Sequence, residues 1–298
     1  MHNVLHLLSH ATLHTLGEVG RLIPFLFLSY LLMEFMEHRS GNLAENWLRG
    51  SGRVGPLVGG VLGMLPQCGF STMATGLYAG RILTVGTLIA VYLSTSDEML
   101  AILISHTVPV PFIFKILGVK LAVGVLAGFF VDAVFRLLRR RRSALAPTPQ
   151  IEELCEREHC KCGEHFLLST VKHTAKTLLF IFLVTFLLNL AVEAIGEERL
   201  GALLLNRPVL GNLLAAFFGL IPNCAPSVIL TELHLGGVLS IGAMLSGLLV
   251  NAGVGTALLL RTNRPIRDSL RILLILLCIG AAVGILIDLT PLAAFLSR

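Results

Sequence analysis

The stretch Gly63-Met64-Leu65-Pro66-Gln67-Cys68 occurs a second time, slightly altered, as Gly219-Leu220-Ile221-Pro222-Asn223-Cys224. Shifting the sequence by 156 positions aligns residues 53–132 with 209–288 without a gap and gives 21 identities in 80 pairs. Composition alone would give roughly six identities, so the chain contains an internal repeat. Before this block the offset becomes 159, pairing His14 with His173, and each repeat is about 120 residues long.

The composition predicts a membrane protein. Of the 298 residues 55% are hydrophobic and 14% are charged, and the mean hydropathy is +0.83. A soluble domain carries roughly 25% charged residues, so an ordinary soluble enzyme is excluded. We expect an all-α polytopic fold with ten transmembrane helices, which are 18–36, 54–79, 82–96, 99–114 and 117–137 in the first repeat and 174–195, 208–234, 237–250, 253–263 and 268–290 in the second.

An odd number of spans in each repeat inverts the second repeat relative to the first. With both termini outside, 16 of the 23 basic residues fall on the inner face, as the positive-inside bias requires. The predicted parts are an amphipathic N-terminal helix at 1–16, the first transmembrane repeat at 17–138, a cytosolic linker at 139–172 and the second transmembrane repeat at 173–298.

Pro66 and Pro222 predict helix breaks at membrane depth, because proline removes a helical hydrogen bond and irregular backbone there must line a cavity or be buried in protein. An amide, a thiol and a hydroxyl follow each proline: Gln67, Cys68 and Ser71 in the first repeat, and Asn223, Cys224 and Ser227 in the second. Two such breaks meet near the midplane of inverted-repeat transporters. Thiols suit a soft cation or a thiol-seeking metalloid, and an oxyanion at the half-helix N-termini is a second reading.

Acidic residues within the spans are candidates for ion coupling, because ionisable groups at membrane depth are costly and usually functional. Asp97 and Glu98 lie between two short predicted spans, and Asn251 occupies the corresponding turn of the second repeat. A solvated cytosolic turn is the alternative. Glu34 and Glu193 are equivalent positions near span ends, where interfacial solvation is the simpler explanation.

Other polar and cysteine residues give weaker signals. The linker contains five candidate metal ligands within eleven residues, namely Cys155, His159, Cys160, Cys162 and His165, and four nitrogen or sulfur ligands satisfy zinc and similar ions. An unspecific polar linker is the alternative. The N-terminal residues His2, His6, His10 and His14 share one helix stripe. Glycines at 124, 128, 280 and 284, near Asp132 and Asp288, predict close helix packing, and Cys278 is expected in the core.

The chain contains no phosphate-binding loop, no zinc-protease motif and no set of nucleophile, base and orienting residue. We therefore expect neither an enzyme nor an ATP-driven pump, and no required cofactor beyond a metal ion in the linker. The expected partners are the lipid bilayer and a metal or metalloid ion, without nucleic acid. A homo-oligomer stays open.

Four segments resemble a known family, the ten-helix heavy-metal exporters of bacteria, whose members are labelled arsenic-efflux proteins or manganese transporters. The segments are residues 24–34, 66–71, 77–81 and 93–98, and the second half carries the related motif at 222–227. The resemblance implies a ten-helix permease of the bacterial inner membrane. It also strengthens the interpretation of the linker as a metal-handling segment.

Three functions remain open from the sequence. The first is a secondary exporter of a heavy metal or trivalent arsenical with Cys68 and Cys224 as ligands and Asp97 or Glu98 as coupling acid. The second is a transporter of Mn(II) or another hard divalent cation, for which oxygen ligands dominate. The third is a metal-sensing membrane subunit that moves nothing.

Overall fold

The computed structural model describes residues 54–65, 68–141, 166–195, 209–263 and 266–297, with single residues and short runs between 12 and 31. Every regular element in these ranges is a helix, so the expected all-α fold is confirmed for the described part of the chain. Residues 142–165 of the linker and most of the proposed N-terminal helix lie outside the described residues.

The helices differ widely in length. In chain order they are Val54–Gly63, α3 (Cys68–Ala79), α4 (Val85–Ser94), α5 (Asp97–Ser105), α6 (Val110–Arg141), α8 (Phe166–Ile195), α10 (Leu210–Gly219), α11 (Ala225–Leu235), α12 (Ile241–Val250), α13 (Gly255–Thr262), α14 (Ile266–Leu289) and α15 (Leu292–Ser297). α6 ends and α8 begins inside the range that the sequence assigned to the linker.

Four described segments are long and apolar enough to cross a membrane: Val85–Ser105, Val110–Leu138, Ile241–Thr262 and Ile266–Leu289. The first joins α4 to α5 and the third joins α12 to α13. A helix of ten residues, such as α4 or α12, is about 15 Å long, half of a hydrocarbon core of about 30 Å. The sequence predicted separate spans at 82–96 and 99–114, but α5 already ends at Ser105.

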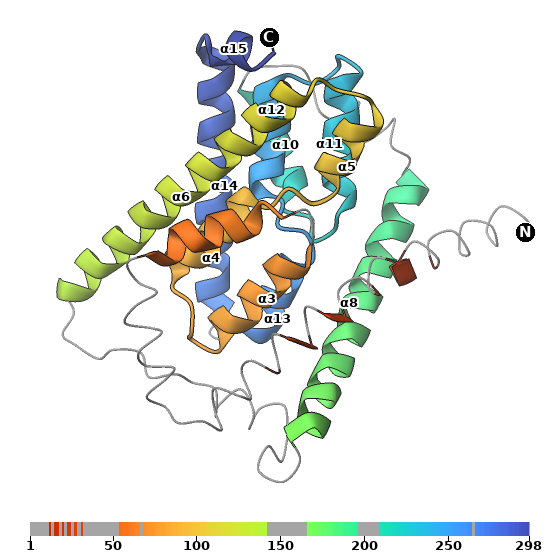
Figure 1. Cartoon of the computed structure of the whole chain (residues 1–298), viewed down its shortest axis with the longest axis vertical. Coiled ribbons are helices and arrows are strands. Elements are labelled where there is room, and N and C mark those ends of the chain that lie inside the picture. The colour runs from red at the N-terminus through yellow and green to blue at the C-terminus, as the bar shows by residue number, and fades with distance from the viewer. Residues whose placement is uncertain are drawn as a thin grey trace, which may run out of the picture.

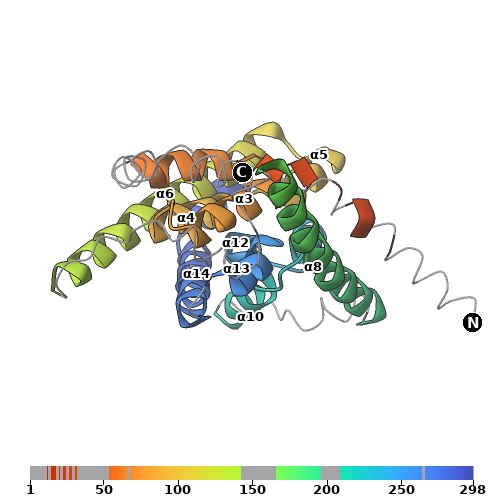
Figure 2. The same ribbon diagram turned by 90° about the horizontal axis from the view of Figure 1, so that it is seen from below.

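Long helices enclose the short ones. Figures 1 and 2 show α6 and α8 on opposite sides of a group of short helices. The outer faces of the long helices are apolar, with Leu126 of α6 70% exposed and Leu274 of α14 60% exposed, as expected for contact with lipid. Cys278 is exposed on α14, so its predicted core position is wrong. The packed face of α14 contains Leu276 and Gly280, and Cys278, two residues from each, points about 200° away.

Contacts along the chain fix the directions of the short helices. Ideal Cβ atoms built on Gly59 and Gly63 lie 3.0 Å from the Thr87 carbonyl oxygen and 2.6 Å from the Val91 carbonyl oxygen. Helix 54–63 therefore runs parallel to α4, close enough that only glycine fits. α3 runs antiparallel to α4, because Thr75 contacts Tyr92 while the following turn leads directly back into α4. The chain therefore enters helix 54–63 and leaves α3 at the same end of the molecule.

The second repeat has the same arrangement. Along α10 and α12, Asn212 contacts Ser246 and Ala215 lies against Gly247, so these two helices are parallel. α11 returns beside α12, because Ser227 at its start contacts Asn251 just after the end of α12.

Equivalent aspartates fasten equivalent helices in the two repeats. Asp132 of α6 accepts hydrogen bonds from the Gly86 N–H (2.8 Å) and the Thr84 hydroxyl (2.7 Å) at the start of α4. Asp288 of α14 accepts from the Gly242 N–H (2.9 Å) and the Ser240 hydroxyl (2.7 Å) at the start of α12. Each carboxylate supplies acceptors to a helix N-terminus, where backbone N–H groups lack helical partners.

Glycine completes these two helix pairs, as the spacing predicted. A Cβ on Gly128 would lie 2.6 Å from the Gly86 carbonyl oxygen, and one on Gly284 would lie 2.6 Å from the Gly242 carbonyl oxygen. Any larger residue at either position would separate the two backbones.

One prediction of sidedness is wrong. The ten-span arrangement placed the turn at 80–81 outside and the loop before Asp268 inside. The Tyr78 hydroxyl nevertheless donates to Asp268 (2.8 Å), and an Arg81 nitrogen lies 3.5 Å from the same carboxylate. Both segments therefore lie at one end of the molecule. Hydropathy could not detect this, because a helix pair that turns back is as apolar as one that crosses.

We expect Asp132→Ala and Asp288→Ala each to lower the free energy of unfolding by about 3 kcal/mol, because buried N–H and hydroxyl donors lose a charged acceptor. Thermal aggregation in detergent, followed by size-exclusion chromatography, measures the change. Leu126→Ala, on the lipid-facing side of α6, is the control and should have little effect. Equal melting temperatures for the aspartate variants and the control would contradict this role.

Candidate functional site

Buried polar side chains collect where the short helices end. Asn223, Asn251, Ser71 and Ser227 are each at most 2% exposed. They come from the first turn of α3 (Ser71), the segment before α11 (Asn223), the first turn of α11 (Ser227) and the turn between α12 and α13 (Asn251). The structure therefore places four of the predicted substrate-binding residues inside the protein, at the ends of half-length helices.

Side-chain amides stabilise the turn between α10 and α11, which we call the tip of the second repeat. The Asn251 amide donates to the Ser227 hydroxyl (2.6 Å), and its oxygen accepts from the Gly253 N–H (2.9 Å). The Asn223 oxygen accepts from the Cys224 N–H (2.6 Å). Cys224 is 3% exposed. Four predicted residues, Asn223, Cys224, Ser227 and Asn251, thus belong to one buried turn region.

The tip of the first repeat packs against the second repeat. A Cβ on Gly255 would lie 3.0 Å from the Ser71 hydroxyl oxygen. The Gly255 carbonyl accepts from the Tyr92 hydroxyl (3.0 Å), which also lies 2.5 Å from the Thr75 hydroxyl. Ser71 therefore lies beside the N-terminus of α13, and the two repeats meet at the ends of their half-helices.

Several of these groups were not among the residues predicted from the sequence. Thr75 and Thr231 are an identical pair in the repeat alignment, and each donates to the carbonyl four residues earlier, at Ser71 and Ser227 respectively (2.6 Å in both). The repeat identity was the available signal. Lys120 was counted among the outer basic residues, yet it is 1% exposed.

The remaining predicted residues are only partly described. Glu98 is half-buried in the first turn of α5. The side chains of Cys68, Asp97 and Glu193, and the whole of Gln67 and Glu34, lie outside the described set. The linker ligands Cys155, His159, Cys160, Cys162 and His165 and the N-terminal histidines lie outside it as well. Their roles stay predictions. Within the described residues, no three His, Cys, Asp or Glu side chains are close enough together to hold a metal ion.

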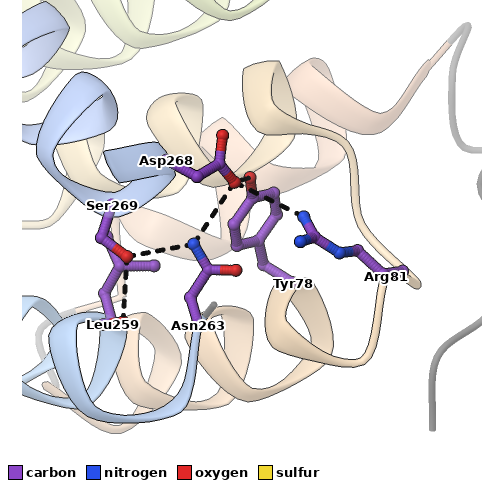
Figure 3. A network of polar contacts seen from close by, with 6 residues as sticks. All are labelled: Tyr78, Arg81, Leu259, Asn263, Asp268 and Ser269. Carbon is purple, nitrogen blue, oxygen red and sulfur yellow. Dashed lines mark hydrogen bonds and ion pairs between the residues drawn. The ribbon is translucent and has the colours of Figure 1, made fainter. Parts of the chain in front are cut away.

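Two polar contacts join the repeats at opposite ends. At one end, Asp268 lies in the first turn of α14. Its carboxylate accepts hydrogen bonds from Tyr78, Arg81 and the Asn263 amide (3.3 Å), as Figure 3 shows. Asn263 also donates to Ser269 (3.0 Å).

At the other end, His106, just after α5, lies 2.9 Å from Glu232 of α11. Figure 1 shows α3 and α13 together at the first end, and α5 and α11 together nearer the second. The first contact therefore joins α3 and the turn after it to α14 of the other repeat, and the second joins the end of α5 to α11.

Comparison with known proteins gives one match. A protein-family model described as "Putative, 10TM heavy-metal exporter" matches residues 18–198. No curated protein and no solved structure matches the chain.

Within the Asp268 network, we expect Tyr78→Phe to reduce stability more than Arg81→Ala. The Tyr78 hydroxyl donates a short hydrogen bond (2.8 Å) to Asp268, and phenylalanine has no donor to replace it. The loss should lower the free energy of unfolding by about 1–2 kcal/mol. The arginine contact is long and partly exposed, and such pairs contribute about 0–1 kcal/mol. Melting curves in detergent measure both variants, and the reverse order would show that the ion pair dominates.

Proposed function

The chain belongs to the family of ten-helix heavy-metal exporters, and on that basis we propose that it is a secondary-active transporter of a metal or metalloid ion. Its described helices include four of membrane-spanning length and composition. We place it in the bacterial inner membrane with both termini outside and the central linker in the cytosol, since this orientation keeps most basic residues inside.

We infer that each repeat contains one re-entrant helix pair. Residues 54–79 enter and leave at the inner face, and residues 209–235 enter and leave at the outer face. The contacts of Tyr78 and Arg81 with Asp268 support the first pair, and the contact of His106 with Glu232 supports the second. The broken segments α4–α5 and α12–α13 then each cross the membrane once, and the two repeats remain inverted.

One observation carries the proposed transport site. Ser71 in the first helix pair and Ser227 in the second are both buried polar residues near the ends of their half-helices. Both contact the broken segment α12–α13, Ser227 through Asn251 and Ser71 through Gly255. Irregular backbone at membrane depth is tolerated only where it is buried in protein or lines a cavity. Transporters built from inverted repeats bind substrate at such helix breaks.

The two inter-repeat contacts suit alternating access. Opening the inner side would separate α3 from α13 and α14, and opening the outer side would separate α11 from α5. The Asp268 network and the His106–Glu232 pair lie at these two positions. They would therefore close the pathway in turn, while the polar tips between them hold the ion.

We propose a soft ion, such as trivalent arsenic or Cd(II), as the substrate. Cys68 and Cys224 would be its ligands, because thiolate is the soft ligand among side chains. The supporting polar residues would be Gln67, Asn223, Ser71, Ser227 and Asn251. Burial of Cys224 beside Asn223 supports this assignment for the second repeat. The sequence candidates for ion coupling are Asp97 and Glu98, in the first turn of α5 at the break of a crossing segment, with Glu34 and Glu193 as weaker candidates.

A hard divalent cation such as Mn(II) is the second candidate. Oxygen ligands would then dominate, and the buried amide oxygens of Asn223 and Asn251 together with Asp97 and Glu98 would hold the ion. A metal-sensing subunit that uses only the linker cysteines and histidines is the third. A sensor would bind metal without net flux across proteoliposomes.

Cysteine labelling tests the re-entrant pairs. In a chain whose native cysteines are replaced, Arg81→Cys and Arg267→Cys should react with a membrane-impermeant maleimide from the inner side only, and Val238→Cys from the outer side only. The ten-span arrangement predicts the reverse for positions 81 and 238, so labelling of Val238→Cys from the inside would overturn the re-entrant topology.

Ion flux tests the transport site. Proteoliposomes loaded separately with As(III), Cd(II) and Mn(II) should release at least one of them. If thiols are the ligands, Cys68→Ser combined with Cys224→Ser should abolish As(III) and Cd(II) flux because two soft ligands are lost.

Cys278→Ser, which changes an exposed cysteine of α14, is the matched control and should transport normally. Loss of flux in Asp97→Asn and Glu98→Gln, with normal flux in the double cysteine variant, would favour Mn(II). Binding without flux of any ion in the wild type would refute transport altogether.

A further inference from the structure

Lys120 is a cation in the middle of the protein. Its side chain is 1% exposed, and it lies ten residues into α6. At 1.5 Å per residue this is about 15 Å from the end of the helix, near the centre of a bilayer. A lysine at that depth is costly, and such residues are usually functional.

The Lys120 ammonium joins the two repeats. It donates to the Leu248 carbonyl (2.9 Å) in the last turn of α12 and to the carbonyl of Thr95, the C-cap residue of α4. Carbonyls at a helix C-terminus lack helical partners and carry the negative end of the helix dipole. One positive charge thus serves the ends of two half-helices, one from each repeat.

Each acceptor is adjacent to a proposed substrate-binding tip. Ser96, next to Thr95, donates to the Met64 carbonyl (2.7 Å), two residues before Pro66. Asn251, three residues after Leu248, donates to Ser227. The charge is therefore linked by short paths to both tips, and a second positive charge at the tips would be repelled by it.

The fold itself does not require a lysine here. The equivalent position of the second repeat is Leu276, which is fully buried in α14. α14 nevertheless pairs with α12 through Asp288 and glycine just as α6 pairs with α4. The charge is thus an addition to one repeat and not part of the shared packing.

Among the described residues, the helices packed around Lys120 contribute the following titratable groups. α4 contributes Tyr92, which contacts Thr75 and Gly255, and α12 contributes none. α5 begins with Asp97 and Glu98, directly after Thr95 and Ser96. On α6 itself, Lys115 lies over the Phe295 ring, and Asp132 accepts a hydrogen bond from the start of α4. On α14, Asp288 accepts a hydrogen bond from the start of α12.

We propose that Lys120 carries the coupling proton for a cationic substrate, an inference that rests on the proposed transport function. The ammonium and the substrate cation exclude each other. When a cation enters from the cytosol, the ammonium gives its proton to water on that side and the neutral amine remains. After the cation leaves, the amine takes a proton from water on the outer side and again joins α4 to α12. One proton thus moves inward at this residue for each cation moved outward.

Proteoliposomes with Cd(II) as the probe test this proposal. An acidic lumen should drive Cd(II) accumulation in the wild type, and a lumenal pH dye should report the matching proton loss. Lys120→Gln should keep exchange of radioactive for unlabelled Cd(II) and lose both acid-driven accumulation and proton movement. Lys120→Arg should lose exchange as well, because arginine stays protonated. A purely structural cation would instead be rescued by arginine.

Lys115→Gln is the matched control, since Lys115 is a half-buried lysine of the same helix that donates to the Phe295 carbonyl (3.0 Å). It should retain accumulation and proton movement. Acid-driven accumulation at the wild-type level in Lys120→Gln, or normal transport by Lys120→Arg, would overturn the proposal. If Lys120→Gln does not elute as a folded protein, the arginine variant alone decides. If the wild type moves no Cd(II), both the proposed transport of this cation and the role of Lys120 are refuted. If the wild type transports Cd(II) normally and the Lys120 variants behave like it, only the role of Lys120 is refuted.

Discussion

Backbone polar groups at the ends of half-length helices are the constraint on which the described structure depends. In a bilayer, water does not reach such ends, so each free N–H and carbonyl must find a partner within the protein. This chain provides those partners from side chains: Asp132 and Asp288 at the starts of α4 and α12, and Lys120 at their ends. The carboxylates bond N–H groups and the ammonium bonds carbonyls, so each charge matches the sign of its helix end.

The sequence predicted much of this arrangement. The repeated proline motif predicted a break in each of two helices, and in the second repeat α10 ends at Gly219 and α11 begins at Ala225. The 156-residue offset relates Asp132 to Asp288 as partners of equivalent helices. The four-residue glycine spacing predicted the close contacts of α6 and α14. These features depend on local backbone chemistry, which a single sequence records directly.

Other features depend on tertiary contacts and could not be predicted. An apolar stretch of 26 residues at 54–79 reads as a crossing helix, and only its contacts with α4 reveal that its two ends lie together. Lys120 is the fourth residue of the predicted span 117–137, close to its end, and no local pattern indicated that it is buried. Its burial depends on α12, which is more than a hundred residues away. The direction in which Cys278 points likewise depends on which face of α14 the neighbouring helices cover.

The glycine contacts between α4 and α6, and between α12 and α14, have a mechanical consequence. Backbones in direct contact, with an aspartate bonded across them, have little room to slide. Each of these helix pairs should therefore move as one rigid unit. Within the described half-helices, rotation is then easiest at the short non-helical segments Thr95–Ser96 and residues 251–254, at the depth where the polar tips lie. A small rotation there would displace the outer ends of α5 and α13 by a larger distance.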